Sequence, residues 1–245
     1  HPVRLVTLGY LSYVLAGWIL LVLPFAHASE RVSALDALFT ATSAMSTTGL
    51  ATASTGKDFN LFGQAVILVL IQLGGIGYMT FGSFVILSRS QTLSERRQLI
   101  GSTVFNLPQE FRIDKFIRSV AVFTFLTEVV GATALFAVFS SLDMPDALWS
   151  AVFHSVSAFC TAGFSLYDNS FEQFRANVAV NVILAVLSYL GAIGFIVFVD
   201  VWRRLIGKTS AFTLTSRVIL VTTAWVSVVG VVLFFVGDPS IQTLP

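Results

Sequence analysis

The chain has 245 residues, of which 56% are hydrophobic and only 11% are charged. Ordinary soluble domains carry roughly 25% charged residues, so this composition excludes a typical water-soluble domain and favours a protein embedded in a bilayer. The formal net charge of +1 identifies no partner, and we expect no nucleic-acid binding. The single cysteine, Cys160, excludes an internal disulfide.

The chain opens with an uncharged segment, Leu5–Ala26, that is long enough to cross a bilayer, since a spanning helix needs about 20 apolar residues. It is longer than the apolar core of a signal peptide, and no A-x-A-like cleavage site follows it. The next segment, Ser33–Thr55, is too apolar for a solvated loop, yet a span here would put the following basic loop outside. We therefore predict a re-entrant half-helix of about three turns, with Ser33 as N-cap and Asp36 completing a capping-box-like start.

Two more apolar segments follow in the chain. Phe59–Ser88 is the second predicted span, and it leads into a basic connector over residues 89–115. Ser119–Leu142 is the third, interrupted only by Glu128. An acid inside a span is a functional candidate, so Glu128 is a candidate support for a pore-loop backbone or for a basic group. A protonated or hydrogen-bonded contact between helices is the simpler alternative.

A second half-helix is predicted after the third span. It opens near Asp146, runs through His154 and then returns toward the outer side. His154 is interpreted as a core histidine, because three scattered histidines and one cysteine form no metal cluster. Ala176–Val199 is the fourth predicted span and Val218–Gly237 is the fifth.

The positive charges are distributed unevenly along this pattern. If the five spans alternate in direction, eleven of the fourteen Lys and Arg residues fall on one side of the membrane. The positive-inside rule then predicts a multi-pass protein with a cytoplasmic N-terminus. The outer loops are acidic and would raise the local cation concentration, although each acid on its own is also typical of a solvated loop.

The two half-helices belong to an internal repeat, which must be recognised before the fold is assigned. Ala37–Leu50 and Ala151–Phe164 share six of fourteen residues at an offset of 114. Downstream, Leu73–Tyr78 matches Leu190–Phe195 at an offset of 117. The unit is therefore span, outer half-helix, span. It occurs twice, and the fifth span lies where a third copy would begin.

The turn after each half-helix suits a cation. Non-helical backbone at membrane depth occurs only where it lines a cavity or is buried in protein. A half-helix that enters from outside points its partially negative C-terminus inward, and an extended return presents carbonyls that can replace hydration water. Gly49 and Gly163 fit such returns because glycine reaches positive φ without strain. The second spans carry small residues that we interpret as close-packing sites under these turns: Gly74, Gly75, Gly77, Gly191 and Gly194.

The chain resembles the Trk/Ktr/HKT superfamily of potassium and sodium transporters, and most of all its Ktr-type membrane subunits. The resemblance rests on the repeat, on the turns Ser-Ala-Met-Ser-Thr-Thr-Gly-Leu and Ser-Ala-Phe-Cys-Thr-Ala-Gly-Phe, and on the Leu-Gly-Gly-Ile-Gly span. It covers essentially the whole chain and implies an all-α membrane protein of repeated transmembrane helix–pore loop–transmembrane helix units, like a potassium channel. It implies two selectivity-filter turns, formed by Ser46, Thr47, Thr48 and Gly49 and by Cys160, Thr161, Ala162 and Gly163.

The resemblance also carries expectations about ions and partners. A Gly at the first turn goes with potassium in this family and a Ser with sodium, so Gly49 favours K⁺, with Na⁺ as the alternative. No covalently bound cofactor and no other metal is expected. The family implies the bacterial inner membrane, surrounding lipid, a homodimer of the full-length subunit and a cytoplasmic nucleotide-binding regulatory ring. Four filter turns surround its pore, so two turns amount to about half of one.

These observations divide the chain into four parts. Residues 1–88 form the first helix–pore loop–helix repeat, and residues 89–115 form a cytoplasmic connector. Residues 116–206 form the second repeat, and residues 207–245 hold a connector and the first helix of an incomplete third repeat.

The leading hypothesis is therefore uptake of a potassium-type monovalent cation, by channel-like passage or by symport. A sodium-selective or non-selective transporter of the same fold is an alternative, and a non-conducting membrane scaffold or sensor is another. We do not expect an enzyme, because the chain holds no H-E-x-x-H, no G-x-S-x-G and no paired intramembrane acids.

Overall fold

The computed structural model describes residues 2–28, 31–77, 113–207 and 211–237. These ranges are helical and contain no named strand, so the prediction of an all-α protein is confirmed for them. The elements in chain order are α1 (Pro2–Val22), η1 (Pro24–Ala26), α2 (Ala34–Met45), α3 (Leu61–Ile76), α6 (Ile113–Ser141), α7 (Ala147–Phe159), η2 (Glu172–Phe174), α8 (Val178–Ile193), α9 (Phe195–Leu205) and α10 (Leu214–Gly237).

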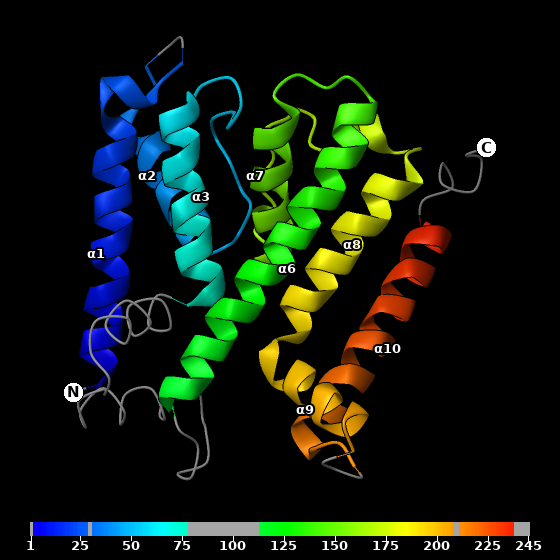
Figure 1. Cartoon of the computed structure of the whole chain (residues 1–245). Helices are drawn as coiled ribbons and strands as arrows, with labels where there is room; N and C mark the ends of the chain where they lie inside the picture. The colour runs from blue at the N-terminus through cyan, green and yellow to red at the C-terminus, as the bar shows by residue number, and fades with distance from the viewer. Residues whose placement is uncertain (1, 29–30, 78–112, 208–210, 238–245) are drawn as a thin grey trace. The chain divides into compact units, whose positions relative to one another are not determined.

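The first repeat consists of α1, α2 and α3, which pack against one another (Figure 1). The short helix α2 begins as predicted, because the Ser33 side chain accepts a hydrogen bond from the Asp36 amide at 3.1 Å. Trp18 ties α1 to the start of α2 by donating its ring N–H to the Ala34 carbonyl at 2.8 Å. Asn60 caps α3 by accepting from the amides of the two residues that follow Leu61. The predicted half-helix is therefore present as three turns between two longer helices.

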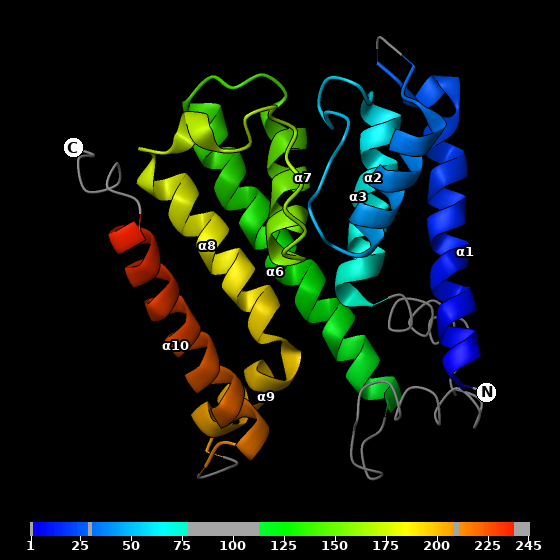
Figure 2. The same ribbon diagram turned by 180° about the vertical axis from the view of Figure 1, so that it is seen from behind.

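The second repeat has the same plan, with α7 as the short helix packed along α6 (Figure 2). Asp146 precedes α7 in a left-handed conformation, at φ 50°, and its side chain makes no capping hydrogen bond. A cluster behind α7 is formed by Leu135, Phe139 and Val180, which come from α6 and α8. The predicted second half-helix is confirmed, although it starts without the Ser-type cap of the first.

The second helix of each repeat lies directly against the end of its short helix. A Cβ atom added to Gly74 would lie 2.1 Å from the Met45 carbonyl oxygen, and one added to Gly191 would lie 1.7 Å from the Phe159 oxygen. Both distances are far below van der Waals contact, so only glycine fits at either position. The interpretation as close-packing sites is confirmed for Gly74 and Gly191, which lie against the C-terminal ends of the short helices, and for Gly75, whose added Cβ would lie 2.4 Å from the Cys160 sulfur. It is wrong for Gly194, whose added Cβ would meet no atom of the described residues within 4 Å.

Glycines also end the two second helices. α3 stops at Ile76 and is followed by Gly77 at φ 81°, while α8 stops at Ile193 and is followed by Gly194 at φ 80°. The fourth predicted span, Ala176–Val199, is thus interrupted rather than continuous, because a positive-φ residue cannot continue a right-handed helix. The remainder of the second predicted span, residues 78–88, lies outside the described residues, as does the connector 89–115 up to residue 112.

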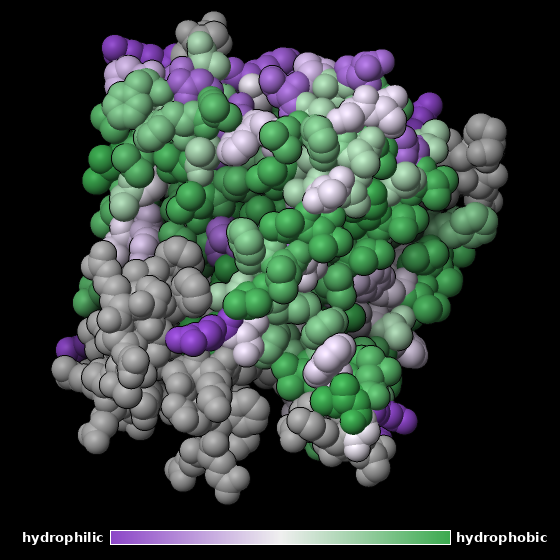
Figure 3. Space-filling view, in the orientation of Figure 1, coloured by the Kyte–Doolittle hydropathy of each residue, from purple (hydrophilic) through white to green (hydrophobic). Residues whose placement is uncertain are grey.

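Two of the described helices are long and apolar enough to cross a membrane, Ile117–Ser141 within α6 and Leu214–Gly237, which is α10. The apolar helices Thr7–Val22, Leu61–Ile76 and Val178–Ile193 are shorter. Large hydrophobic side chains such as Phe125 on α6 and Leu8 on α1 are about two-thirds exposed. Figure 3 shows a broad hydrophobic surface over the helices of residues 2–192, with hydrophilic residues gathered at the end that holds the loops after α1 and α6. Such a surface suits contact with lipid.

The last described residues, 193–207 and 211–237, form a separate compact unit. Within it, Asp200 on α9 accepts hydrogen bonds from the hydroxyls of Thr213 and Ser216, the latter at 2.5 Å. Thr213 also accepts from the Ser216 amide at 3.2 Å, which caps the start of α10. The Asp200 carboxylate therefore ties α9 to the first turn of α10.

Candidate cation-binding site

The two predicted filter turns have the same backbone conformation. Thr47 and Thr161 follow the helix ends in left-handed conformations at φ 50° and 51°, and Gly49 and Gly163 have φ 79° and 73°. Left-handed backbone is unusual for threonine, and its recurrence at the same step of both repeats identifies one defined turn.

The backbone hydrogen bonds of the turns also correspond. The amides of Ser46 and Cys160, which cap the helices, donate to carbonyls four residues back, both at 2.9 Å. The amides of Thr48 and Ala162 donate to carbonyls five residues back, at 2.9 and 2.8 Å. All eight predicted filter residues thus lie in two equivalent turns that leave the C-terminal ends of α2 and α7, where the partial negative charge of a helix is concentrated.

The two turns lie against each other. A Cβ atom added to Gly49 would lie 2.6 Å from the Ala162 carbonyl oxygen and 3.0 Å from the Gly163 Cα, and one added to Gly163 would lie 3.2 Å from the Gly49 Cα. Gly49 is therefore required twice, by its positive φ and by the neighbouring turn, while Gly163 is required by its positive φ and is tightly packed against Gly49. Residues 114 positions apart in the sequence meet at one point.

A cavity of ≈ 420 Å³ is lined by Gly49 and Gly163 and by the two return segments that follow them. Its wall is mostly small or hydroxylated, formed by the rest of the two returns: Ala51, Thr52, Ala53, Ser54, Thr55, Phe164, Ser165, Tyr167, Asp168 and Ser170. Backbone and hydroxyl oxygens are the ligands that hard cations prefer. A cation that approaches the two turns from the outer-loop side would pass through this space.

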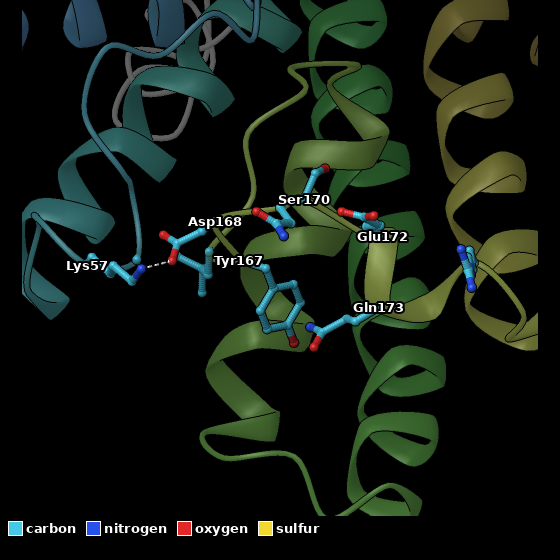
Figure 4. A pocket seen from close by; sticks show the side chains of 10 residues that line it. Lys57, Tyr167, Asp168, Ser170, Glu172 and Gln173 are labelled. Carbon is cyan, nitrogen blue, oxygen red and sulfur yellow. Dashed lines mark ion pairs between the residues drawn. The ribbon is translucent and has the colours of Figure 1, made fainter.

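A neighbouring pocket of ≈ 920 Å³ is lined in part by Lys57 and Asp168, which link the two return segments. Lys57 forms an ion pair with Asp168, and Ser54 donates to the other carboxylate oxygen of Asp168 at 2.6 Å. Figure 4 shows Lys57 and Asp168 pointing toward each other from the two repeats, with Tyr167 and Gln173 further along the pocket wall. The returns are thus joined above the turns by polar side chains.

Three acidic residues of these loops are engaged in hydrogen bonds or an ion pair within the protein. The pKa of Asp168 lies below its ordinary value, chiefly because Lys57 hydrogen-bonds to it and also because Ser54 does. The pKa of Lys57 is raised by the same hydrogen bond. Asp58 accepts a hydrogen bond from the Ser54 amide at 2.6 Å, and the Asp36 carboxylate accepts one from Ser33. These three acids stabilise loops and a helix start, and the charge of Asp168 is balanced by Lys57.

The second return is held to α7 by side chains on one face of that helix. The Ser157 hydroxyl donates to the Phe164 carbonyl at 2.6 Å, and the ring nitrogen Nε2 of His154 accepts from the Leu166 amide at 3.1 Å. The other ring nitrogen, Nδ1, lies 2.8 Å from the Ser150 carbonyl and donates to it, since Nε2 is the acceptor. His154 is almost completely buried, so the interpretation as a core histidine is confirmed, and its contacts position the return.

Aromatic rings complete this support. The His154 ring stacks on Tyr167 at 4.9 Å between centroids, and Phe171 meets it edge-on at 4.7 Å. The Tyr167 hydroxyl lies 2.6 Å from the Ser150 hydroxyl. The return from Phe164 to Tyr167 is therefore fixed at its backbone and at its side chains.

Glu128 lies behind the second turn and is 7% exposed. The Gln72 amide on α3 donates to both carboxylate oxygens, at 2.9 and 3.1 Å, and the Cys160 sulfur lies 4.0 Å from one of them. The Ser155 hydroxyl of α7 donates to the Glu128 carbonyl at 2.8 Å. Glu128 thus makes a hydrogen-bonded contact between helices, the simpler of the two interpretations, and this contact joins both repeats beside the turn that begins at Cys160.

Sequence reasoning missed the partners of these groups. Gln72 is a polar amide in the middle of an apolar span, and that position was the available signal. Ser150 lies four residues before His154 on α7 and Ser157 lies three residues after it, so all three share one face of the helix. Nothing in the sequence pointed to the Lys57–Asp168 link, because its two residues lie on loops of different repeats.

Comparison with known proteins identifies relatives along the chain. A family model described as "Cation transport protein", TrkH, matches residues 13–237. The potassium/sodium uptake protein NtpJ of Enterococcus hirae is 33% identical over 99% of this chain and 54% of its own length. The Ktr system potassium uptake protein B of Vibrio alginolyticus is 33% identical over 95% of this chain and 51% of its own length. The protein of the same name from Bacillus subtilis is 30% identical, over 98% and 53%.

The chain thus spans about half the length of these curated relatives. The family match covers both repeats with their short helices and turns, and it extends to the end of α10. A membrane protein of repeated helix–short helix–helix units is what the sequence predicted. The chain belongs to the TrkH family of cation transport proteins.

Proposed function

We propose that this chain supplies part of a pathway for potassium-type monovalent cation uptake, with Ser46–Gly49 and Cys160–Gly163 as two of its filter turns. The observation that carries the proposal is the meeting of two equivalent turns at Gly49 and Gly163, which together line a cavity between the two return segments. Carbonyls arranged around such a point replace the hydration shell of an ion. Two turns surround only part of an axis, so further turns complete the path.

The helix ends and the glycines have separate roles in this pathway. The C-terminal ends of α2 and α7 supply partial negative charge to the ion without a carboxylate, which holds the cation weakly enough for it to leave. Gly49 and Gly163 allow the turns to approach each other. Glu128 supports the second turn through Gln72 and Cys160. The pathway moves an ion and carries out no covalent chemistry.

The remaining expectations about the assembled protein stay predictions. They are a cytoplasmic N-terminus, a homodimer in the bacterial inner membrane with surrounding lipid, and docking of a cytoplasmic nucleotide-binding ring by the connector 89–115. The relatives named for potassium uptake and for potassium and sodium uptake favour K⁺ as the ion, with Na⁺ as the alternative.

The test is uptake of K⁺ and Na⁺ into proteoliposomes that hold the assembled transporter with Gly49→Ser or Gly163→Ser. Gly207→Ser is the matched control, because Gly207 also has a positive φ, at 71°, but its added Cβ would meet no atom within 4 Å. The filter variants should lose at least about tenfold in K⁺ uptake relative to Na⁺, which corresponds to about 1.4 kcal/mol of ion discrimination. The control should keep the ratio. An unchanged ratio in both filter variants would show that these turns do not select the ion.

A further inference from the structure

Two hydroxyl groups on α2 are buried without a partner. Thr40 is completely buried and Ser43 is 5% exposed, and neither side-chain oxygen has a hydrogen-bond partner within the described ranges. A buried hydroxyl is nearly always hydrogen-bonded, to protein or to ordered water, because its desolvation is otherwise uncompensated. Thr40 and Ser43 are three residues apart on one helix, so their side chains are neighbours on the same face.

The repeat shows what this face does in the other copy. At the offset of 114, Thr40 corresponds to His154 and Ser43 corresponds to Ser157. In the second repeat these two side chains bind the Phe164 carbonyl and the Leu166 amide, and so hold the return to the helix.

The equivalent backbone groups of the first repeat are the Leu50 carbonyl and the Thr52 amide. Threonine is several atoms shorter than histidine, so its side chain cannot reach from the helix to the return as the imidazole does in the second repeat.

We propose that Thr40 and Ser43 together bind a buried water molecule that joins α2 to the return of the first filter turn. The water takes the place that the His154 imidazole occupies in the second repeat. A buried water needs two to four polar partners, and the two unpartnered hydroxyls supply two of them. The correspondence of the repeats makes the Leu50 carbonyl and the Thr52 amide the further partners. That the water supports a filter turn rests on the proposed function, whereas the water site itself does not.

A bound water and an unpartnered hydroxyl at Thr40 predict opposite changes in melting temperature. Valine has the shape of threonine without the hydroxyl. If Thr40 binds nothing, Thr40→Val removes an uncompensated buried hydroxyl, and the melting temperature rises. If Thr40 holds the water, the same change leaves the water and the return with a missing partner. The melting temperature then falls, by about 2–4 °C for a loss the size of one hydrogen bond.

The experiment compares Thr40→Val and Ser43→Ala with two controls in the assembled transporter in detergent. Thr42→Val is the control for the exchange itself, since Thr42 is exposed and its hydroxyl donates to the Leu38 carbonyl at 2.8 Å within the same helix. Ser157→Ala is the control for a known direct bond to a return. We expect Thr40→Val and Ser43→Ala to lower the melting temperature as Ser157→Ala does. A rise, or a shift no larger than that of Thr42→Val, overturns the proposal.

A second measurement does not depend on the variants. A density map at a resolution that shows ordered waters should contain one within hydrogen-bond distance of both the Thr40 and Ser43 hydroxyls. A dry position, or a protein group in its place, overturns the proposal even if the variants fail to fold. Both measurements are made without ion flux. A failure of potassium uptake in the filter variants would therefore leave the water site standing, and the reverse also holds.

Discussion

The two repeats build the same turn on different supports. Gly49 and Gly163 have nearly equal φ, and the backbone hydrogen bonds at the two helix ends agree within 0.2 Å. The amide bonds of Thr47 and Thr161 are 3.2 and 3.0 Å long, and those of the residues that follow them are 2.9 and 2.8 Å long. Behind the turns the agreement ends. The second return is bound by Ser157 and His154, while Ser43 and Thr40 bind no described group. The turn geometry therefore comes from the helix end and the glycine, and the side chains behind it are free to differ.

The second helices of the two repeats make the same contact with their short helices. Gly74 and Gly191 occupy the same position of the repeat and approach the same carbonyl of their short helices. Backbone contacts that leave no room for a side chain are thus shared by both copies, whereas contacts made by side chains are specific to one. A substitution at a shared contact should affect both repeats alike, and one at a specific contact should not.

The largest effect is expected from Gly191→Ala and Gly74→Ala. The added methyl groups would meet backbone oxygens at 1.7 and 2.1 Å, and backbone cannot rotate away as a side chain can. Each change should lower the free energy of unfolding at or above the upper end of the ~1–3 kcal/mol range of overpacking. Thermal unfolding in detergent measures it. Gly230→Ala is the control, because its Cβ would meet no atom within 4 Å. Loss in one repeat only would contradict the shared role.

The second effect tests the support that only the second repeat has. His154→Ala should lower the free energy of unfolding by about 2–4 kcal/mol, because it opens a cavity beside Tyr167 and leaves the Leu166 amide without its acceptor. His154→Phe keeps a ring for stacking and removes the nitrogens, so it isolates the hydrogen bonds and should cost less. Melting temperatures of both variants give the comparison. If His154→Phe matched the wild type, packing alone would hold the return.

A third, intermediate effect concerns the contact between the repeats. Glu128→Ala leaves the partly buried Gln72 amide without its carboxylate partner and should lower the free energy of unfolding by about 1–3 kcal/mol. Glu128→Gln still offers the amide an oxygen and should retain most of the stability. The double variant Gln72→Leu, Glu128→Leu removes both partners and should be more stable to thermal unfolding than Glu128→Ala. Thermal unfolding separates the three. Equal losses in Glu128→Ala and Glu128→Gln would mean that the carboxylate charge, and not the hydrogen bond, matters here.

Much of this plan could be predicted from the sequence, because it follows from local signals. The Ser33 cap, the apolar half-helices and the turns ending at Gly49 and Gly163 are all encoded within a few residues of where they act. The second-helix glycines were recognisable for the same reason, since glycine at matched positions of two copies has few explanations other than close approach.

The remainder depends on contacts between distant segments. No local pattern indicates that Gln72 meets Glu128 or that Ser54 and Lys57 meet Asp168, because the chain must fold before these residues lie together. The interruption at Gly194 was also missed, since a hydrophobic run reads as one span whether or not a glycine within it has positive φ. A hydropathy pattern reports burial in lipid and carries no information on backbone angles.

The smallest effect is expected at the link between the returns, Lys57 and Asp168. The carboxyl pKa is lowered, so its contribution to stability is present above the ordinary value of 3.8 and is lost as the pH falls through the lower folded value. The Lys57 pKa is raised, so its contribution is present below the ordinary 10.5 and is lost at higher pH. Lys57→Met should therefore lower the melting temperature slightly between these limits.

The link lies at the surface, where ion pairs contribute little and are screened by salt. The difference between wild type and Lys57→Met should shrink in about 1 M salt, where the Debye length is about 3 Å, and again below the ordinary carboxyl pKa. Lys57→Arg, which keeps the charge, is the control and should behave as the wild type. A difference that persists unchanged in high salt and in acid would show that Lys57 joins the returns by packing, and the two repeats would then share an apolar contact at their outer ends as well.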